Sequence, residues 1–213
     1  RANWMIGSRI AQSTFKDVED SIENKHIVRL WPMRGTLHMV NPLLAHSFLD
    51  LCASKTLSSF PKRREYLWIS DQDAEKALEI IESSLRWGKS LTRDGIEQAL
   101  LDGGIEKKKQ WIYHLCNYAA TRKVICFGPK EGRDDTFVLL DEWIGTNKLS
   151  PEEWKAQIAR SYIRSHGPCT IKDLSRRTWW NMTECKEALA LIKGEYDTIE
   201  YQETAYMHYP SAD

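Results

Sequence analysis

The chain has 213 residues, and its 30 basic side chains balance 30 acidic ones, so its formal net charge is zero. With 42% apolar and 28% charged residues it resembles an ordinary globular protein, long enough for one large domain or two to three small ones. This balance excludes a global basic field, so an argument for nucleic-acid binding has to rest on local charge.

The five cysteines are scattered and contain no C-x-x-C pair, which argues against a disulfide framework or a zinc site. No apolar run approaches the ~18 residues that a membrane-spanning helix needs, and no signal peptide is visible. Together these features predict a cytoplasmic protein without membrane contact, bound metal or other cofactor. The chain begins at Arg1 rather than Met, within an apolar pattern, and we expect it to be a fragment of a longer protein.

Residues 1–52 are predicted to start with the end of a helix and to continue with a second one. Thr14 and Asp17 have the spacing of a capping box, and apolar residues at helical spacing follow, which predicts a helix over 15–25. Asn41-Pro42 is predicted to open a further helix. The apolar stripe of that helix consists of Leu44, Phe48 and Leu51.

A β-hairpin is predicted over residues 27–40, because β-branched and large apolar residues flank a turn at 32–35. The second strand alternates in polarity, so the hairpin places Arg34, Thr36 and His38 on one polar face. Such a face is suited to form one wall of a site. The residue types also fit a structural hairpin with one satisfied histidine.

Residues 53–69 are predicted to be a polar connector with a basic cluster at 62–64, and residues 70–148 follow the plan of a winged helix. Helices are predicted from Ser70, from Leu91 and over 107–122, and strands at 124–127 and 136–140 with a turn at 128–135. Three helices followed by a two-stranded hairpin are the winged-helix variant of helix-turn-helix.

Residues 149–213 repeat this order, with helices predicted from Ser150-Pro151, Thr170 and Thr183 and a strand at 198–201. An internal duplication of a whole unit is a stronger signal than any single helix. Residues 1–52 fit the back half of a third such unit. The expected fold is therefore mainly α with small β-hairpins (α+β), built from tandem winged-helix units, the last of them truncated.

Residues 107–133 carry seven basic side chains against one acidic one, a net +6 in a neutral chain. Three of the lysines stand at the predicted start of a helix, where backbone N–H groups also favour phosphate. The predicted DNA contacts of this stretch are Lys107, Lys108, Lys109 and Gln110 at the helix and Lys130 and Arg133 in the wing turn. Asp134 and Asp135 adjoin the wing, so a solvated charged face on a module for protein contacts is the alternative.

The last unit carries a weaker basic surface, in which Arg176 and Arg177 are the predicted DNA contacts. Trp179-Trp180 is interpreted as core rather than as a platform for bases. Enzyme signatures such as H-E-x-x-H, a glycine-rich phosphate loop or G-x-S-x-G are absent from the sequence. From the residues alone we expect tandem winged helices that contact DNA.

The segment R-L-W-P-M-R-G-T-L-H-M-V (Arg29 to Val40) resembles a motif of the AlkZ-like winged-helix DNA-binding family, which comprises bacterial DNA glycosylases and their relatives. The resemblance continues, in the family's order, through residues 90–93, 139–142 and 165–168. It implies a monomer of three tandem winged helices that form a basic concave surface around double-stranded DNA.

The resemblance also implies DNA repair by hydrolysis of the N-glycosidic bond of alkylated purines or of crosslinked bases, without a metal. A base that already carries positive charge leaves readily, so oriented polar groups suffice to position water and to stabilise the sugar cation. In this setting Arg34, Thr36 and His38 are expected to form one wall of the cleft, with Arg34 on phosphate and His38 on the lesion side. The catalytic Gln-x-Gln pair of the family precedes the position that matches Arg1, so no catalytic residue is assigned.

Two other classes of function remain open from the sequence. A non-enzymatic winged-helix transcriptional regulator would prefer one duplex sequence and would bind it as a dimer on two half-sites. A winged helix that serves protein contacts would show no salt-dependent DNA binding.

Overall fold

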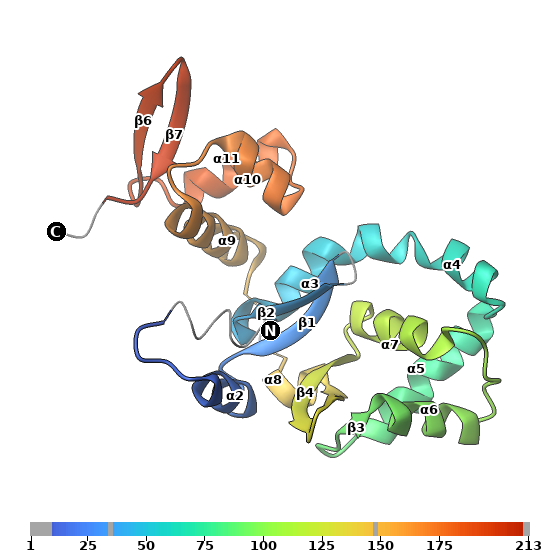
Figure 1. The fold of residues 1–213 in the computed structure, drawn as a ribbon. Helices are drawn as coiled ribbons and strands as arrows, with labels where there is room; N and C mark the ends of the chain where they lie inside the picture. Colours follow the sequence, from blue (N-terminus) through green and yellow to red (C-terminus); the bar gives the residue numbers. More distant parts are fainter. Residues whose placement is uncertain (1–9, 34–35, 147–148, 211–213) are drawn as a thin grey trace. The chain divides into compact units, whose positions relative to one another are not determined.

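The computed structural model describes residues 10–33, 36–146 and 149–210, and the chain divides into two compact units, Arg1–Lys148 and Leu149–Asp213. Within the described residues, ten helices accompany two antiparallel sheets (Figure 1). The expected mixture of helices and β-hairpins is confirmed at this level, whereas the division into three winged-helix units stays a prediction. Each compact unit is described by itself.

A five-stranded antiparallel sheet forms the centre of the first unit. Its strands are β1 (Val28–Met33), β2 (Thr36–Val40), β3 (Leu91–Thr92), β4 (Ile125–Glu131) and β5 (Asp134–Leu139). Their spatial order is β2-β1-β4-β5-β3, and β1 meets β4 where Arg29 lies opposite Phe127. The two hairpins that the sequence places in separate units therefore share one sheet.

Helix α2 (Phe15–Glu23) confirms the predicted helix start. The hydroxyl of Thr14 accepts the N–H of Asp17, and the Asp17 carboxylate accepts the N–H of Thr14 at 2.6 Å, so the capping box is complete. Val18 is buried, but Phe15, expected on the same face, is exposed, and the helix ends before residue 25.

The N-terminal hairpin forms where it is predicted, but its first strand is longer than expected. Pro32 and Met33 belong to β1 rather than to the turn, and Pro32 is buried. The pairing with β2 is irregular between Leu30 and Met33. This irregularity accommodates a proline, which has no N–H to donate to the ladder. Arg34 lies outside the described residues.

The prediction that residues 53–69 form a polar connector is wrong. Helix α3 (Pro42–Leu57) runs through its beginning, and helix α4 (Phe60–Leu67) occupies most of the remainder (Figure 1). Phe60, Arg64 and Leu67 recur at helical spacing and are buried, so three inward positions hold a helix that is otherwise polar. In α3 the buried apolar positions are Ala45, Leu49 and Cys52, whereas the predicted stripe of Leu44, Phe48 and Leu51 is half-buried.

Helix α5 (Asp71–Leu85) begins at its predicted cap, Ser70. Helix α6 (Arg93–Asp102) begins two residues later than predicted, after the cap Thr92, because Leu91 and Thr92 form strand β3. Helix α7 (Trp111–Thr121) starts later than residue 107, because Gln110 adopts a left-handed conformation with φ 59° just before it. In the wing, the paired strands continue to residues 131 and 134, so Lys130 lies in β4 and not in a turn. Helix α8 (Leu140–Ile144), which the sequence did not predict, follows β5.

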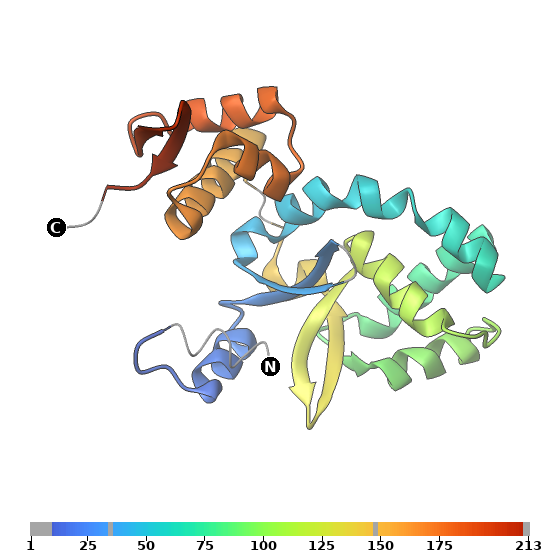
Figure 2. The same cartoon turned by 45° about the horizontal axis from the view of Figure 1, so that its top comes forward.

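Helix α7 is covered on nearly all sides. Nine of its 11 residues are buried, since it lies between the α3–α4 layer and helices α5 and α6 and also contacts β1 and β4 (Figures 1 and 2). Trp111 and Leu115 belong to the hydrophobic core of the unit. His114, in the middle of the helix, is only 4% exposed, and its Nε2 atom has no hydrogen-bond partner among the described residues.

The burial of His114 predicts a pH-dependent stability. Loss of solvent and the nearby guanidinium of Arg64 lower its pKa from 6.5 to about 4. Between these values the unfolded chain binds a proton that the folded chain excludes, so stability is complete above pH 6.5 and is lost as the pH falls. We expect a loss of about 2 kcal/mol.

The measurement is urea denaturation across this pH range, compared with His114→Phe, which keeps a ring but cannot be protonated. The free energy of unfolding of the wild type should fall relative to that of His114→Phe as the pH falls below 6.5. A difference that stays constant with pH would contradict the assignment.

The second unit consists of three helices and a hairpin. These elements are α9 (Pro151–His166), α10 (Ile171–Thr178), α11 (Met182–Leu191), β6 (Asp197–Tyr201) and β7 (Thr204–His208). The predicted caps Ser150 and Thr170 are confirmed, whereas α11 is capped by Asn181 rather than starting at Thr183. Trp180 is buried against Trp154, with ring centroids 5.6 Å apart, which confirms its assignment to the core.

Candidate nucleic-acid interface

The polar face of the N-terminal hairpin is present in part. The Thr36 hydroxyl and the Nε2 atom of His38 lie 2.9 Å apart, so the alternation in β2 does bring them together. Thr36 is exposed, and the half-buried His38 ring approaches Phe48 of α3 at 6.4 Å between centroids. The third member of the predicted face, Arg34, lies outside the described residues.

Arg29 is the buried cation of this region, and the sequence reasoning missed it. Its guanidinium donates to the Asp135 carboxylate at 2.6 Å and to the carbonyl of Gly128, and it lies over the ring of Phe127. These partners belong to the second hairpin. Arg29 therefore ties the two hairpins together and is not available to an external ligand.

Four of the seven basic side chains along residues 107–133 lie within 4.0 Å of a carboxylate of the fold, Lys108 at 4.0 Å from Asp73 being the longest of these pairs. The Lys107 ammonium lies 2.6 Å from the Glu97 carboxylate, which raises the lysine pKa. Arg122 pairs with Glu75 at 2.8 Å, and Lys123 pairs with Asp50. All these acidic partners lie outside the basic stretch, so a count of charges along the sequence overstates the field.

Three predicted contacts keep their charge exposed. They are Lys109, Lys130 and Arg133, none of which forms an ion pair with a described residue. Lys109 precedes α7, Lys130 lies in β4 and Arg133 stands at the hairpin tip. Since α7 itself is covered, the helix that a winged-helix plan places in a DNA groove is not accessible in this unit.

The sequence predicts Lys108 and Gln110 as DNA contacts. In the structure both contact helix α4 or its C-cap residue, a segment expected to be a polar connector. The Arg63 guanidinium donates to the Gln110 side-chain oxygen at 2.6 Å, and the Lys108 ammonium donates to the backbone carbonyl of Trp68. We call the combined patch the α4 surface, and it consists of Lys62, Arg63, Tyr66, Trp68, Lys108 and Gln110. In the sequence, the basic cluster at 62–64 beside two aromatic residues could have predicted this surface.

In the second unit the predicted contacts Arg176 and Arg177 differ from another arginine, Arg160. Arg176 and Arg177, in the last turn of α10, are exposed and form no ion pair with the described residues. Arg160 instead holds the Glu195 carboxylate through two hydrogen bonds of 2.6 Å each. Arg176 and Arg177 therefore keep their charge available, whereas Arg160 does not.

Comparison with known proteins decides the family. The sequence model of the family described as DNA glycosylase AlkZ-like matches residues 1–210. The chain belongs to this AlkZ-like family. It is also similar to an interstrand DNA cross-link repair glycosylase of Streptomyces sahachiroi, with 25% identity over 190 residues, which are 85% of this chain and 51% of the relative.

A solved structure supports the AlkZ-like fold. The chain is similar to the Streptomyces sahachiroi DNA glycosylase AlkZ with a TM-score of 0.72 and 22% identity, over 98% of this chain and 59% of that one. At this identity the likeness shows the fold alone. The chain spans about half the length of the curated relative it matches.

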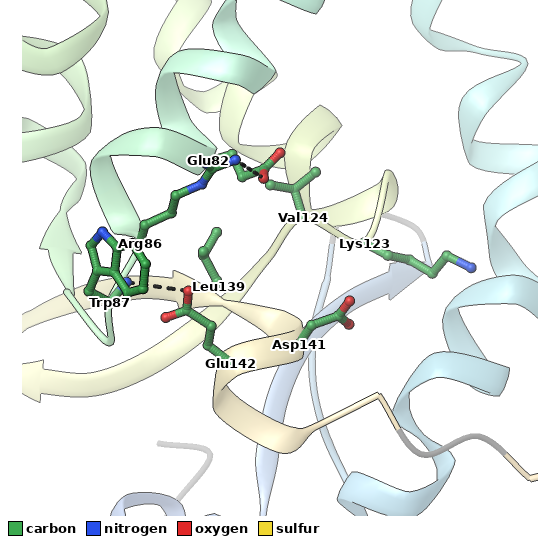
Figure 3. A pocket seen from close by; sticks show the side chains of 8 residues that line it. All are labelled: Glu82, Arg86, Trp87, Lys123, Val124, Leu139, Asp141 and Glu142. Atoms are coloured by element: carbon green, nitrogen blue, oxygen red, sulfur yellow. Dashed lines mark hydrogen bonds and ion pairs between the residues drawn. The ribbon is translucent and has the colours of Figure 1, made fainter.

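One hollow of this AlkZ-like chain, with a volume of about 480 Å³, lies between α5 and α8 (Figure 3). Several polar groups of this hollow are hydrogen-bonded to one another. Glu142 accepts the N–H groups of Trp87 and Gly88, and Arg86 donates to Glu82 at 3.0 Å. Figure 3 shows the Lys123 side chain extending away from Arg86 and Trp87. This arrangement does not identify a ligand.

The thiols of the AlkZ-like chain are unsuited to nucleophilic chemistry. All five cysteines are buried, and burial raises the pKa of Cys116 to about 12. In the part of the chain that the structure describes, no cluster of histidine, cysteine and carboxylate side chains is arranged to hold a metal ion. None of the described helices is both long enough and apolar enough to cross a membrane.

Proposed function

We propose that this AlkZ-like chain is the DNA-binding part of a DNA glycosylase that acts on duplex DNA carrying alkylated purines or interstrand crosslinks. The observation that carries the proposal is the family match over residues 1–210. The order of helices and hairpins in residues 71–139 and 151–208 supports tandem winged-helix units. No residue of the chain is given a catalytic role.

The proposed duplex contacts are those side chains predicted from the sequence that are basic, exposed and without an ion pair to a described residue. They are Lys109, Lys130 and Arg133 in the first unit and Arg176 and Arg177 in the second. Lys107 is a weaker candidate, because its charge is bound to Glu97. Arg34, Thr36 and His38 remain the proposed wall of the cleft, with Arg34 on phosphate and His38 on the lesion side.

The proposal predicts salt-dependent binding of duplex DNA, measured by fluorescence anisotropy with a labelled duplex at low and moderate salt. Combined replacement of Lys109, Lys130 and Arg133 by alanine is expected to lower affinity about tenfold and to flatten the salt dependence, because phosphate contacts release counterions. The simultaneous change of Lys107, Lys108 and Lys109 to alanine should show a smaller effect, since only one of these lysines is free.

A matched control removes equal charge from paired positions, namely Lys107, Arg122 and Lys123, and should weaken binding less at moderate salt, where distant charges are screened. Equal losses in the two triple variants would show that only net charge matters and would contradict the proposed contacts.

A second candidate function is sequence-specific DNA binding without catalysis. Helix α11 favours it, because the side chains of Thr183 and Lys186 are exposed on a helix that follows the helix-turn-helix order. This function predicts a dimer and strong preference for one duplex sequence. Competition between duplexes of unrelated sequence distinguishes the two functions, since a DNA glycosylase should bind these duplexes alike.

A further inference from the structure

Two large aromatic side chains stand exposed at the end of α4. Tyr66 is 72% exposed and Trp68 is 83% exposed, whereas the neighbours of Trp68 in the chain, Leu67 and Ile69, are buried in the hydrophobic core. Because both neighbours are anchored inward, the indole is held pointing away from the core. Such exposure is uncommon for tryptophan, which is usually well buried.

The backbone at Trp68 is fixed in a conformation that disfavours a large side chain. Its φ of 58° and ψ of 34° are left-handed, its N–H is bonded to the carbonyls of Arg64 and Glu65, and its own carbonyl accepts the Lys108 ammonium. Glycine adopts this conformation without steric strain and commonly ends helices. The chain instead places its bulkiest residue type there, and strain of this kind is typical of binding sites.

Positive charge surrounds the two rings. Lys62 and Arg63 are exposed on the same side of α4 and form no ion pair with a described residue. The Arg63 guanidinium lies over the Tyr66 ring at 5.1 Å. These residues line an open hollow of about 750 Å³ together with Trp68, and among the described residues Glu65 is the one acidic side chain that lines it.

We propose that the α4 surface binds an unpaired stretch of DNA, with a base stacked on Trp68 and the backbone phosphates held by Lys62 and Arg63. The inference rests on the proposed function in that the ligand is DNA. Stacking needs an open π-face, which every base has, and a basic groove beside aromatic rings is the arrangement that recognises single strands. A paired base inside a duplex cannot present its face to the indole.

The chain offers a matched control in Trp87. This residue is 88% exposed and has a φ of 70° at the end of α5, but the hollow beside it is lined by three carboxylates, and its two basic side chains, Arg86 and Lys123, are already paired with Glu82 and Asp50. Glycine fits the backbone at both tryptophans, so Trp68→Gly and Trp87→Gly each remove one exposed indole while the fold is kept. Trp68→Asn repeats the test, since asparagine also tolerates left-handed backbone.

The experiment measures fluorescence anisotropy of labelled oligo(dT) and of a labelled duplex, each titrated with the purified chain and its variants. Trp68→Gly is expected to weaken oligo(dT) binding about tenfold, the range found for loss of one stacked base. Trp87→Gly should leave oligo(dT) affinity unchanged, and duplex affinity should be unchanged in both. Circular dichroism melting confirms that each variant is folded.

The outcomes separate this inference from the proposed function. Trp68-dependent oligo(dT) binding without duplex binding would support the α4 surface and contradict the duplex function. Duplex binding together with equal oligo(dT) affinity in wild type and Trp68→Gly would overturn the α4 surface alone, as would equal losses in Trp68→Gly and Trp87→Gly. Trp68-dependent binding of a labelled polyglutamate peptide without oligo(dT) binding would assign the surface to an acidic protein partner and overturn the inference.

Discussion

Replacement of Trp31 by alanine is expected to lower the free energy of unfolding of the first unit by about 3–5 kcal/mol. Trp31 is buried, and its ring meets Phe127 edge-on at 4.6 Å between centroids and also approaches Phe137 and Tyr113. Its partners come from the second hairpin and from α7. Truncation would therefore leave a cavity at the junction of segments that are far apart in the sequence.

Urea denaturation followed by circular dichroism measures this loss. Trp87→Gly is the control, because it removes an indole that touches little and should change stability by less than about 1 kcal/mol. If Trp31→Ala proved as mild as the control, the N-terminal hairpin would have to fold apart from the rest of the unit, and the shared sheet would be wrong.

The helix starts of this fold could be predicted from the sequence because their causes are local. A cap such as Thr14 or Thr170 bonds to groups three residues away, so the pattern and the structure span the same short stretch. The pairing of Arg29 with Phe127 has no such local cause. The alternation of polar and apolar residues within each hairpin does not indicate which strand of the other hairpin will lie beside it.

The candidate interface shows the same limit for charge. Lys107, Lys108 and Lys109 are alike in sequence, but Lys107 is bound by Glu97, Lys108 by the carbonyl of Trp68 and the Asp73 carboxylate, and Lys109 forms no ion pair with a described residue. The fold alone supplies those partners. The α4 surface escaped the sequence reasoning for a related reason, since only three of the eight residues of α4 are buried and the remainder has the composition of a loop.

The ion pair of Arg29 and Asp135 is expected to respond unequally to loss of its two members. The Arg29 side chain is 4% exposed, whereas that of Asp135 is 41% exposed. Asp135→Ala leaves a buried cation without its counter-charge, which is expected to cost about 3–5 kcal/mol. Arg29→Met leaves a carboxylate that water can solvate, so its cost should be smaller, at about 1–3 kcal/mol for the lost hydrogen bonds.

The double variant Arg29→Met/Asp135→Ala should accordingly be more stable than Asp135→Ala alone, because removal of the guanidinium relieves the uncompensated buried charge. Urea denaturation of the three variants and the wild type completes the cycle. If Arg29→Met were instead the costliest change, the bond to the Gly128 carbonyl and the contact with the Phe127 ring would outweigh the ion pair. In either case the hairpins are joined through Arg29, and the measured order identifies which of its contacts holds them together.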